Sequence, residues 1–188
     1  MYSFFNETSF LISKLVTKSY STSFYISSLL LRKDVRTSIF SIYGFVRFAD
    51  EIVDTFHNHK TKELLENFVN DFYLAKEKGI SLNPIINSFV ITLNKYNIPI
   101  EHVEAFLKSM KFDLYKTEYT NKDEINEYIY GSADVVGLIC LKVFCDNNNE
   151  MFEMLKAYAI KLGSAFQKVN FLRDFCSDVE NLNRKYFP

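Results

Sequence analysis

The segments RFADEIVD (residues 47–54) and RDFCSD (residues 173–178) determine the fold and the chemistry that this sequence predicts. Each segment holds an arginine and two aspartates that lie four positions apart. The aspartates are Asp50, Asp54, Asp174 and Asp178. Residues four apart share one face of an α-helix, so each segment predicts a helix that projects two carboxylates to one side. Two such helices facing each other would form an acidic site for Mg²⁺, a hard cation that takes oxygen ligands and is often shared with substrate phosphates.

Length and composition predict a soluble globular protein with a single domain over residues 1–188. The 188 residues are 48% hydrophobic and 24% charged, and the chain is long enough to bury a core. The net charge of −1 argues against a general nucleic-acid-binding protein, which would be strongly basic. Three cysteines without zinc spacing are interpreted as reduced thiols of a cytoplasmic protein. The N-terminus does not fit a signal peptide, and no uninterrupted apolar run reaches the roughly 18 residues that a membrane span needs.

The scarcity of turn residues predicts an all-α fold. Only five glycines and three prolines occur, which favours long helices with short connections, and no alternating period supports a sheet. Helices are expected over residues 5–18, 34–57, 61–78, 84–96, 99–116, 121–144 and 149–180, with a break at 19–23, where small hydroxyl residues favour caps and loops, and a loosened stretch at 131–137.

The first aspartate pair lies on a helix stripe that also carries a phenol and a guanidinium. Tyr43, Arg47, Asp50 and Asp54 follow one another at offsets of four, three and four. Two interpretations stay open: a functional site, or a solvated face with an ordinary Arg–Asp pair. The chain has ten aspartates, so one such pair arises easily by chance, and two pairs favour function more than one does.

The second aspartate pair follows two amides on a helix that is expected to be half buried. Gln167 and Asn170 could orient metal-bound water or hydrogen-bond phosphate oxygens, and Arg173 offers a planar fork that matches phosphate. The chain also has 19 phenylalanines and 12 tyrosines. These indicate either an aromatic core or a large aromatic-lined cavity for a long apolar ligand.

Four segments together carry a resemblance to a known protein family. They are YSTSFY (20–25), IYGFVRFADEIVD (42–54), YIYGSADVVG (128–137) and QKVNFLRDFCSD (167–178). In their order and spacing, over essentially the whole chain, they resemble the squalene and phytoene synthase family, and most of all its bacterial phytoene synthases. The resemblance implies the all-α isoprenoid (terpenoid) synthase fold, in which helices surround a central cavity.

The resemblance also implies roles for individual residues. It assigns the metal to Asp50, Asp54, Asp174 and Asp178, and further active-site positions to Tyr43 and Tyr128. Substrate-binding positions would be Ser21, Ser23, Phe24, Arg47, Ala133, Gln167, Asn170 and Arg173. Among these, the arginines and serines would contact diphosphate, and Phe24 and Ala133 would border the prenyl-tail cavity.

The implied activity is a Mg²⁺-dependent head-to-head condensation of two prenyl diphosphates. For a phytoene synthase, two geranylgeranyl diphosphates give phytoene through a cyclopropyl diphosphate in carotenoid biosynthesis. The alternatives are a squalene or dehydrosqualene synthase that uses farnesyl diphosphate, and a non-catalytic relative that serves as an assembly or interaction protein. Mn²⁺ could replace Mg²⁺, and NADPH would be needed only for squalene formation. Peripheral contact with a membrane is also considered, because the product is an insoluble lipid.

Three features depart from the family pattern. Glu51 stands where many relatives have aspartate, and it keeps the charge. Asp134 stands where a small residue is usual, beside the expected helix kink. The sequence ends at RKYFP, soon after the second aspartate pair, so we expect a domain that lacks its C-terminal helices. Such a domain would leave apolar surface uncovered, and the activity of the 188-residue chain would depend on that surface being covered.

Overall fold

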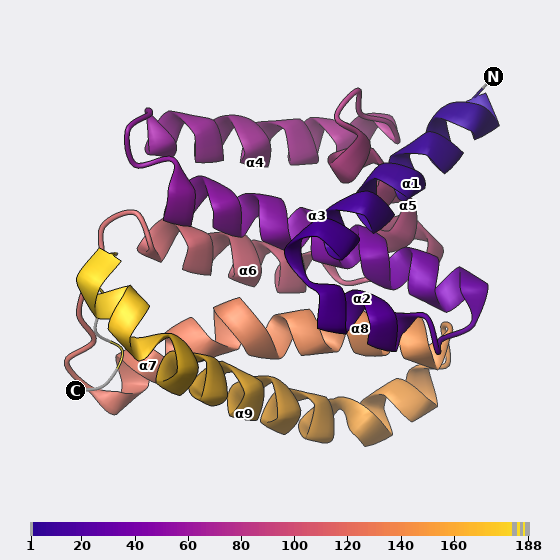
Figure 1. Ribbon diagram of the computed structural model, residues 1–188. Coiled ribbons are helices and arrows are strands. Elements are labelled where there is room, and N and C mark those ends of the chain that lie inside the picture. Colours follow the sequence, from indigo (N-terminus) through magenta and orange to yellow (C-terminus); the bar gives the residue numbers. More distant parts are fainter. Residues whose placement is uncertain (1, 182–183, 185, 187–188) are drawn as a thin grey trace. The chain divides into compact units, whose positions relative to one another are not determined.

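A computed structural model describes residues 2–181, 184 and 186, with side chains except at positions 2, 177, 178 and 181. The described chain is helical throughout and contains no β-strand (Figure 1). The helices are α1 (Tyr2–Tyr20), α2 (Thr22–Ser28), α3 (Lys33–Thr55), α4 (Thr61–Lys78), α5 (Pro84–Lys95), α6 (Ile100–Phe112), α7 (Lys122–Ile129), the π-helical turn η1 (Tyr130–Asp134), α8 (Val135–Cys145) and α9 (Asn149–Asn181). The prediction of an all-α fold is confirmed.

The helices form two compact units. Unit 1 comprises Met1–Ile52 and Glu63–Ile98, and unit 2 comprises Val53–Lys62 and Pro99–Pro188. Unit 1 therefore contains α1, α2, α5 and most of α3 and α4. Unit 2 contains the last residues of α3 and everything from α6 onward.

Local sequence signals set most of the helix ends. Gly79 adopts a left-handed conformation (φ +72°) directly after α4, and Asn83 accepts hydrogen bonds from the Ile85 and Ile86 amides at the start of α5. The break expected at residues 19–23 is confirmed, because α1 ends at Tyr20 and α2 begins at Thr22. Ser21 alone is extended, and its hydroxyl accepts a hydrogen bond from the Phe24 amide, so it caps α2.

In unit 1, α1 packs through hydroxyl side chains and leaves apolar ones exposed. Ser9, Ser13 and Thr17 are fully buried, whereas Leu11 and Leu15 are 62% and 61% exposed. The hydroxyls of Ser13 and Ser88 lie 2.7 Å apart, so small side chains let α1 approach α5 closely while their polar groups stay paired. The buried face of α1 is therefore polar.

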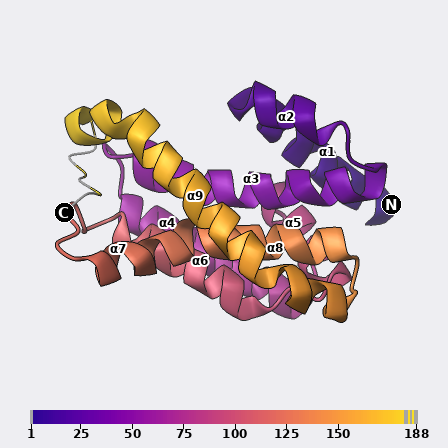
Figure 2. The same cartoon turned by 90° about the horizontal axis from the view of Figure 1, so that it is seen from below.

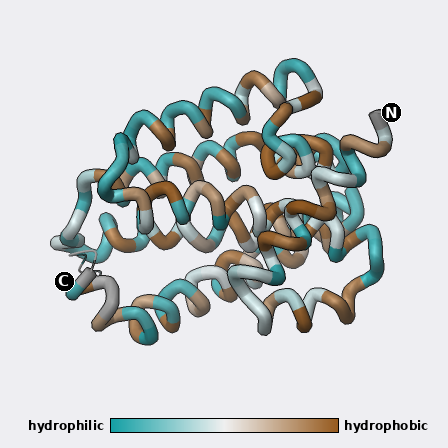
Figure 3. The backbone as a smooth tube through the Cα atoms, turned by 45° about the horizontal axis from the view of Figure 1, so that its top comes forward, coloured by the Kyte–Doolittle hydropathy of each residue, from teal (hydrophilic) through white to brown (hydrophobic). Residues whose placement is uncertain are grey.

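The core of unit 1 is aromatic. Phe45 of α3 stacks on Phe89 of α5 with ring centroids 4.0 Å apart, and it also packs against Phe68 and Phe72 of α4. Brown and teal alternate along the helices in Figure 3, as expected for amphipathic helices. Part of the high phenylalanine content is thus ordinary core.

In unit 2, α7, η1 and α8 follow one continuous helical path, and α9 returns along α8 (Figure 1). Figure 2 shows α9 running obliquely to α8. Backbones meet closely on both sides of η1. A Cβ at Gly131 would lie 2.7 Å from the Ala105 carbonyl oxygen of α6, and one at Gly163 would lie 2.9 Å from the Ala133 carbonyl oxygen. The loosened stretch predicted around residues 131–137 is thus a π-helical turn held between α6 and α9.

Asp134 is the buried polar residue of this turn. It is 5% exposed, and one of its carboxyl oxygens accepts a 2.8 Å hydrogen bond from the Ser164 hydroxyl of α9. Burial raises the pKa of the Asp134 carboxyl, and the Ser164 bond and the charge of Lys168 offset this only in part. The residue therefore links η1 to α9 but is costly to ionise.

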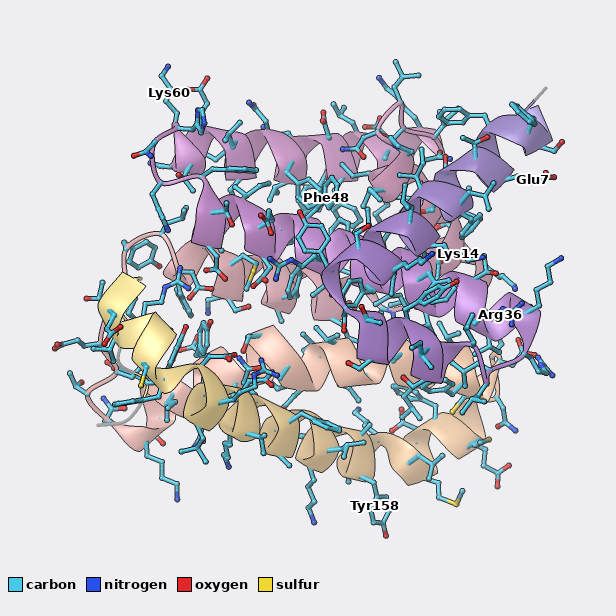
Figure 4. All side chains as sticks on the ribbon, viewed as in Figure 1. Glu7, Lys14, Arg36, Phe48, Lys60 and Tyr158 are labelled. Atoms are coloured by element: carbon cyan, nitrogen blue, oxygen red, sulfur yellow. The ribbon has the colours of Figure 1, made fainter. Side chains whose placement is uncertain are left out.

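The stretch Lys122–Cys145 is long and apolar enough to cross a membrane by length and composition, although Asp134 and Lys142 interrupt it. Of its most apolar window, 61% is buried, so packing in the core accounts for its composition. The opposite side of the α8–α9 pair is different. Tyr158 points away from α8 (Figure 4), and Leu162 and Phe166 follow it as exposed apolar side chains of α9. These side chains give α9 an exposed apolar face.

Replacing Gly131 by alanine should destabilise the protein. In an unconstrained helix this change stabilises by about 0.5–1 kcal/mol, but here the new methyl group would clash with the Ala105 carbonyl and the Ser109 side chain. We expect a loss of about 1–3 kcal/mol in the free energy of unfolding, measured by urea denaturation. Ser132→Ala in the same turn adds no atom and serves as the control. A stabilised Gly131→Ala variant would contradict the close contact.

Asp134→Asn should make stability less sensitive to pH. Because folding raises the pKa of Asp134, its ionisation costs stability; the cost is absent below the unfolded-state pKa and complete above the folded-state pKa. An asparagine oxygen can still accept the Ser164 bond, so the variant should be more stable than the unaltered protein at neutral pH. The difference should vanish in acid. Urea denaturation at several pH values measures this, and an equal difference at every pH would refute it.

Candidate functional site

The first aspartate pair is divided between the two units, with Asp50 in unit 1 and Asp54 in unit 2. In unit 1, Arg47 binds two carboxylates of its own helix. Its Nη1 donates to Asp50 Oδ2 at 2.9 Å, and its Nη2 donates to Glu51. The side chains of Arg47 and Asp50 are 30% and 36% exposed, so the pair is only partly shielded from solvent. Glu51, the departure noted in the sequence, thus shares the arginine with Asp50.

The segment at residues 20–25 joins the same site. The Arg47 guanidinium lies over the Tyr20 ring, 4.6 Å from its centroid, and Phe24 stacks on Tyr43 at 5.2 Å. Ser21 caps α2 beside them, and Ser23 is exposed. Unit 1 therefore brings two of the sequence motifs together into one cluster of aromatic and charged groups.

Charge and burial shift the pKa values in this cluster. Burial raises the pKa of the Tyr43 phenol; Arg47 opposes the increase, and Asp50 adds to it. Burial disfavours the Arg47 cation, but Asp50 and Glu51 outweigh that effect and raise the pKa of Arg47. Tyr43 is thus a neutral hydrogen-bonding group at neutral pH, and Arg47 is a fixed positive charge.

In unit 2, Asp54 is bound by an arginine from the far end of the chain. Arg184 Nη1 donates to Asp54 Oδ1 at 2.6 Å across 130 positions of sequence. Its Nη2 donates to the backbone oxygens of Asp113 and Val53, at 3.1 Å and 3.4 Å. The Arg184 side chain is 6% exposed and the Asp54 side chain 29%. A buried cation is therefore paired with one of the predicted metal ligands.

Tyr128 lies in the aromatic cluster beside this ion pair. Its hydroxyl donates to Asp113 Oδ2 at 3.2 Å, and its ring packs against Tyr119, Phe171 and Tyr186. Burial, followed by the charge of Asp113, raises the pKa of Tyr128 well above its ordinary value. The phenol therefore stays protonated, and hydrogen bonding through Asp113 connects it with Arg184.

On α9, Arg173 binds its neighbour Asp174 through two hydrogen bonds. The Nε and Nη2 atoms donate to the two carboxylate oxygens at 2.7 Å and 2.6 Å. Arg173 is 66% exposed and Asp174 41% exposed, so solvent reaches both. Gln167 and Asn170 are partly buried on the same helix, and Ala133 contacts α9 at Gly163. The side chain of Asp178 lies outside the described part of the structure.

The donor chemistry of these aspartates fits a hard divalent cation. The candidate ligands are carboxylate oxygens, which such cations prefer. Each of the three aspartates with a described side chain already binds one cationic group, an arginine guanidinium. Over the described side chains, no three His, Cys, Asp or Glu residues are grouped as a metal site. That the two aspartate pairs face one another stays a prediction.

The sequence analysis missed Arg184 and Asp113. Arg184 stands in the segment RKYFP, six residues beyond Asp178, and Asp113 ends the apolar helix α6. An arginine near an aspartate motif is only a weak indication of a site residue. Nothing in the spacing shows that Arg184 contacts Asp54 at the end of α3. Tyr186, two positions after Arg184, stacks on Phe171 of α9 at 4.1 Å.

The chain is similar to phytoene synthases in sequence. It is 28% identical to the phytoene synthase of Arthrospira platensis over 190 residues, covering 96% of this chain and 61% of that protein. It is also 28% identical to the chloroplastic phytoene synthase 2 of Solanum lycopersicum over 179 residues, covering 92% and 56%. The chain thus spans little more than half the length of these relatives.

The fold is similar to that of solved squalene synthase-type structures. A squalene synthase HpnC from Alicyclobacillus acidocaldarius superposes with a TM-score of 0.82 at 22% identity, covering 95% of this chain and 65% of that one. A dehydrosqualene synthase solved with a ligand gives 0.78 at 23% identity, covering 90% and 57%. The profile of the squalene/phytoene synthase family matches residues 17–188. The chain therefore belongs to the squalene/phytoene synthase family.

Proposed function

We propose that this chain carries the diphosphate-binding and ionising part of a head-to-head prenyl transferase. The reaction joins two prenyl diphosphates, and geranylgeranyl diphosphate is the proposed substrate because the relatives named above are phytoene synthases. Farnesyl diphosphate is the alternative, since the structural relatives include a dehydrosqualene synthase. Carotenoid biosynthesis is the pathway proposed for the geranylgeranyl case.

The observation that carries the proposal is the arrangement around Arg47. One guanidinium contacts Asp50, Glu51 and the face of Tyr20, and the stacked rings of Phe24 and Tyr43 belong to the same unit. A guanidinium beside carboxylates and aromatic faces suits a substrate that has a diphosphate head and a long apolar tail. A merely solvated helix face would not place the Tyr20 ring against the Arg47 guanidinium.

We propose that Asp50, Asp54, Asp174 and Asp178 hold Mg²⁺, with Mn²⁺ as a substitute. When bound, the cation neutralises the charge that develops on the departing diphosphate. Arg47 and Arg173 are partly exposed, so each guanidinium can turn from its carboxylate toward phosphate oxygens. Both arginines would then stabilise the leaving group by charge-assisted hydrogen bonds.

The aromatic residues would protect the allylic cation that remains after ionisation. The face of the Phe24–Tyr43 pair offers negative π density without a nucleophile. Tyr128 is held as a neutral phenol and does not supply a phenolate that could trap the cation. Water exclusion by such walls keeps the cation available for the double bond of the second substrate.

The proposal is tested by incubating the protein with Mg²⁺ and labelled geranylgeranyl or farnesyl diphosphate. We expect a C40 hydrocarbon from the first substrate and a C30 hydrocarbon if the second is used, detected by chromatography and mass spectrometry. Chelation of the metal should abolish the product. Mn²⁺ binding, followed by electron paramagnetic resonance, gives a second readout that does not depend on turnover.

Asp50→Asn should weaken Mn²⁺ binding by at least about tenfold, because it removes a proposed ligand charge. The matched control is Asp71→Asn, which removes one charge from an exposed position of α4 in the same unit. Equal Mn²⁺ binding by the two variants and the unaltered protein would reject the assignment of Asp50 to the metal.

A further inference from the structure

Arg184 differs from the other two arginines that bind the predicted metal ligands. The Arg47 and Arg173 side chains are 30% and 66% exposed, whereas the Arg184 side chain is 6% exposed. Arg184 also donates to two backbone oxygens, those of Asp113 and Val53. If the Arg184 guanidinium moved away, both hydrogen bonds would break and the two backbone oxygens would lose this partner. The guanidinium is therefore fixed in this position.

Tyr186, two positions beyond Arg184, is anchored as well. Tyr186 stacks on Phe171 of α9 with nearly parallel rings, 4.1 Å apart, and on Tyr119 at 5.6 Å. The ring positions fix the backbone two residues beyond the arginine. Arg184 is therefore held on one side by the aromatic cluster and on the other by the end of α3.

The contact with Asp54 uses only one carboxylate oxygen. Arg184 Nη1 binds Oδ1, and the Asp54 side chain keeps 29% of its surface exposed. A carboxylate fixed through one oxygen has its rotation restricted, and the second oxygen can be presented to a cation. This is how groups behind metal ligands orient them in many proteins.

Arg184 also balances a second carboxylate. Its Nη1 lies 3.9 Å from Asp113 Oδ1, and the Asp113 side chain is 2% exposed. The other Asp113 oxygen accepts the Tyr128 hydrogen bond. The positive charge is thus shared between a fully buried carboxylate and a partly exposed one, which keeps the Asp54 carboxylate from being fully neutralised by its own partner.

We propose that Arg184 is a positioning residue that orients Asp54 toward a divalent cation and does not compete with that cation. The inference rests on the proposed metal-binding role of Asp54. It predicts that loss of Arg184 weakens metal binding. A guanidinium that merely stood in for the cation would have the opposite effect, because its removal would leave a more negative site.

The test measures Mn²⁺ affinity by electron paramagnetic resonance for the unaltered protein and for Arg184→Gln, Arg184→Lys and Asp54→Asn. Arg184→Gln should bind Mn²⁺ about 10–100-fold more weakly, as expected when a group that orients a ligand is lost. Arg184→Lys keeps the charge but loses the planar fork. Its Mn²⁺ affinity should lie between that of the unaltered protein and that of Arg184→Gln. If Arg184→Gln does not fold, Arg184→Lys provides the test, because its positive charge still lies near the buried Asp113 carboxylate. The double variant Asp54→Asn/Arg184→Gln should bind no more weakly than Asp54→Asn alone.

The control is Arg32→Gln, which breaks an exposed ion pair with Asp34 and should leave Mn²⁺ affinity unchanged. Unchanged or tighter Mn²⁺ binding by folded Arg184→Gln and Arg184→Lys, together with weaker binding by Asp54→Asn, would overturn the positioning role while the metal site stood. Unchanged binding by Asp54→Asn would overturn the metal role of Asp54 and this inference with it.

Discussion

A half-buried carboxylate keeps its charge most readily beside a positive partner, and the candidate site depends on this constraint. Each described aspartate of the two motifs is bound by an arginine: Asp50 by Arg47, Asp174 by Arg173, and Asp54 by Arg184. The pairing lets several acidic groups exist in apolar surroundings without losing their charge. The arginines differ in burial: Arg47 and Arg173 are partly exposed, whereas Arg184 is buried and held by further hydrogen bonds.

Small side chains produce the helix contacts that support this arrangement. Ser13 meets Ser88 in unit 1, and in unit 2 the glycines at 131 and 163 let α6 and α9 contact the π-helical turn. Close backbone approach leaves no room for large side chains at these crossings. The aromatic residues are consequently found in the core around Phe45, in the cluster around Tyr128, and beside Arg47.

The aromatic content thus has more than one use. The sequence left open an aromatic core or an aromatic cavity. Phe45 and Phe89 are core residues, with exposures of about 1%. Phe24 is 37% exposed and stacks on Tyr43 in the polar cluster, which is where an apolar substrate would need a ring. Composition could not separate these roles, because both rest on the same side chains and differ only in what surrounds them.

Most of the helices could be predicted from local features of the sequence. Spacing, capping residues and scarce turn residues predicted most helix bounds, since these depend on interactions within a few positions of the chain. The break predicted at residues 19–23 consists of one extended residue, Ser21, which caps α2. Only the tertiary structure decided that Arg184 binds Asp54 across 130 positions, that Asp113 balances the same cation, and that the kink is a π-helical turn between two glycine contacts. These contacts join residues that are distant in sequence, so no local pattern records them.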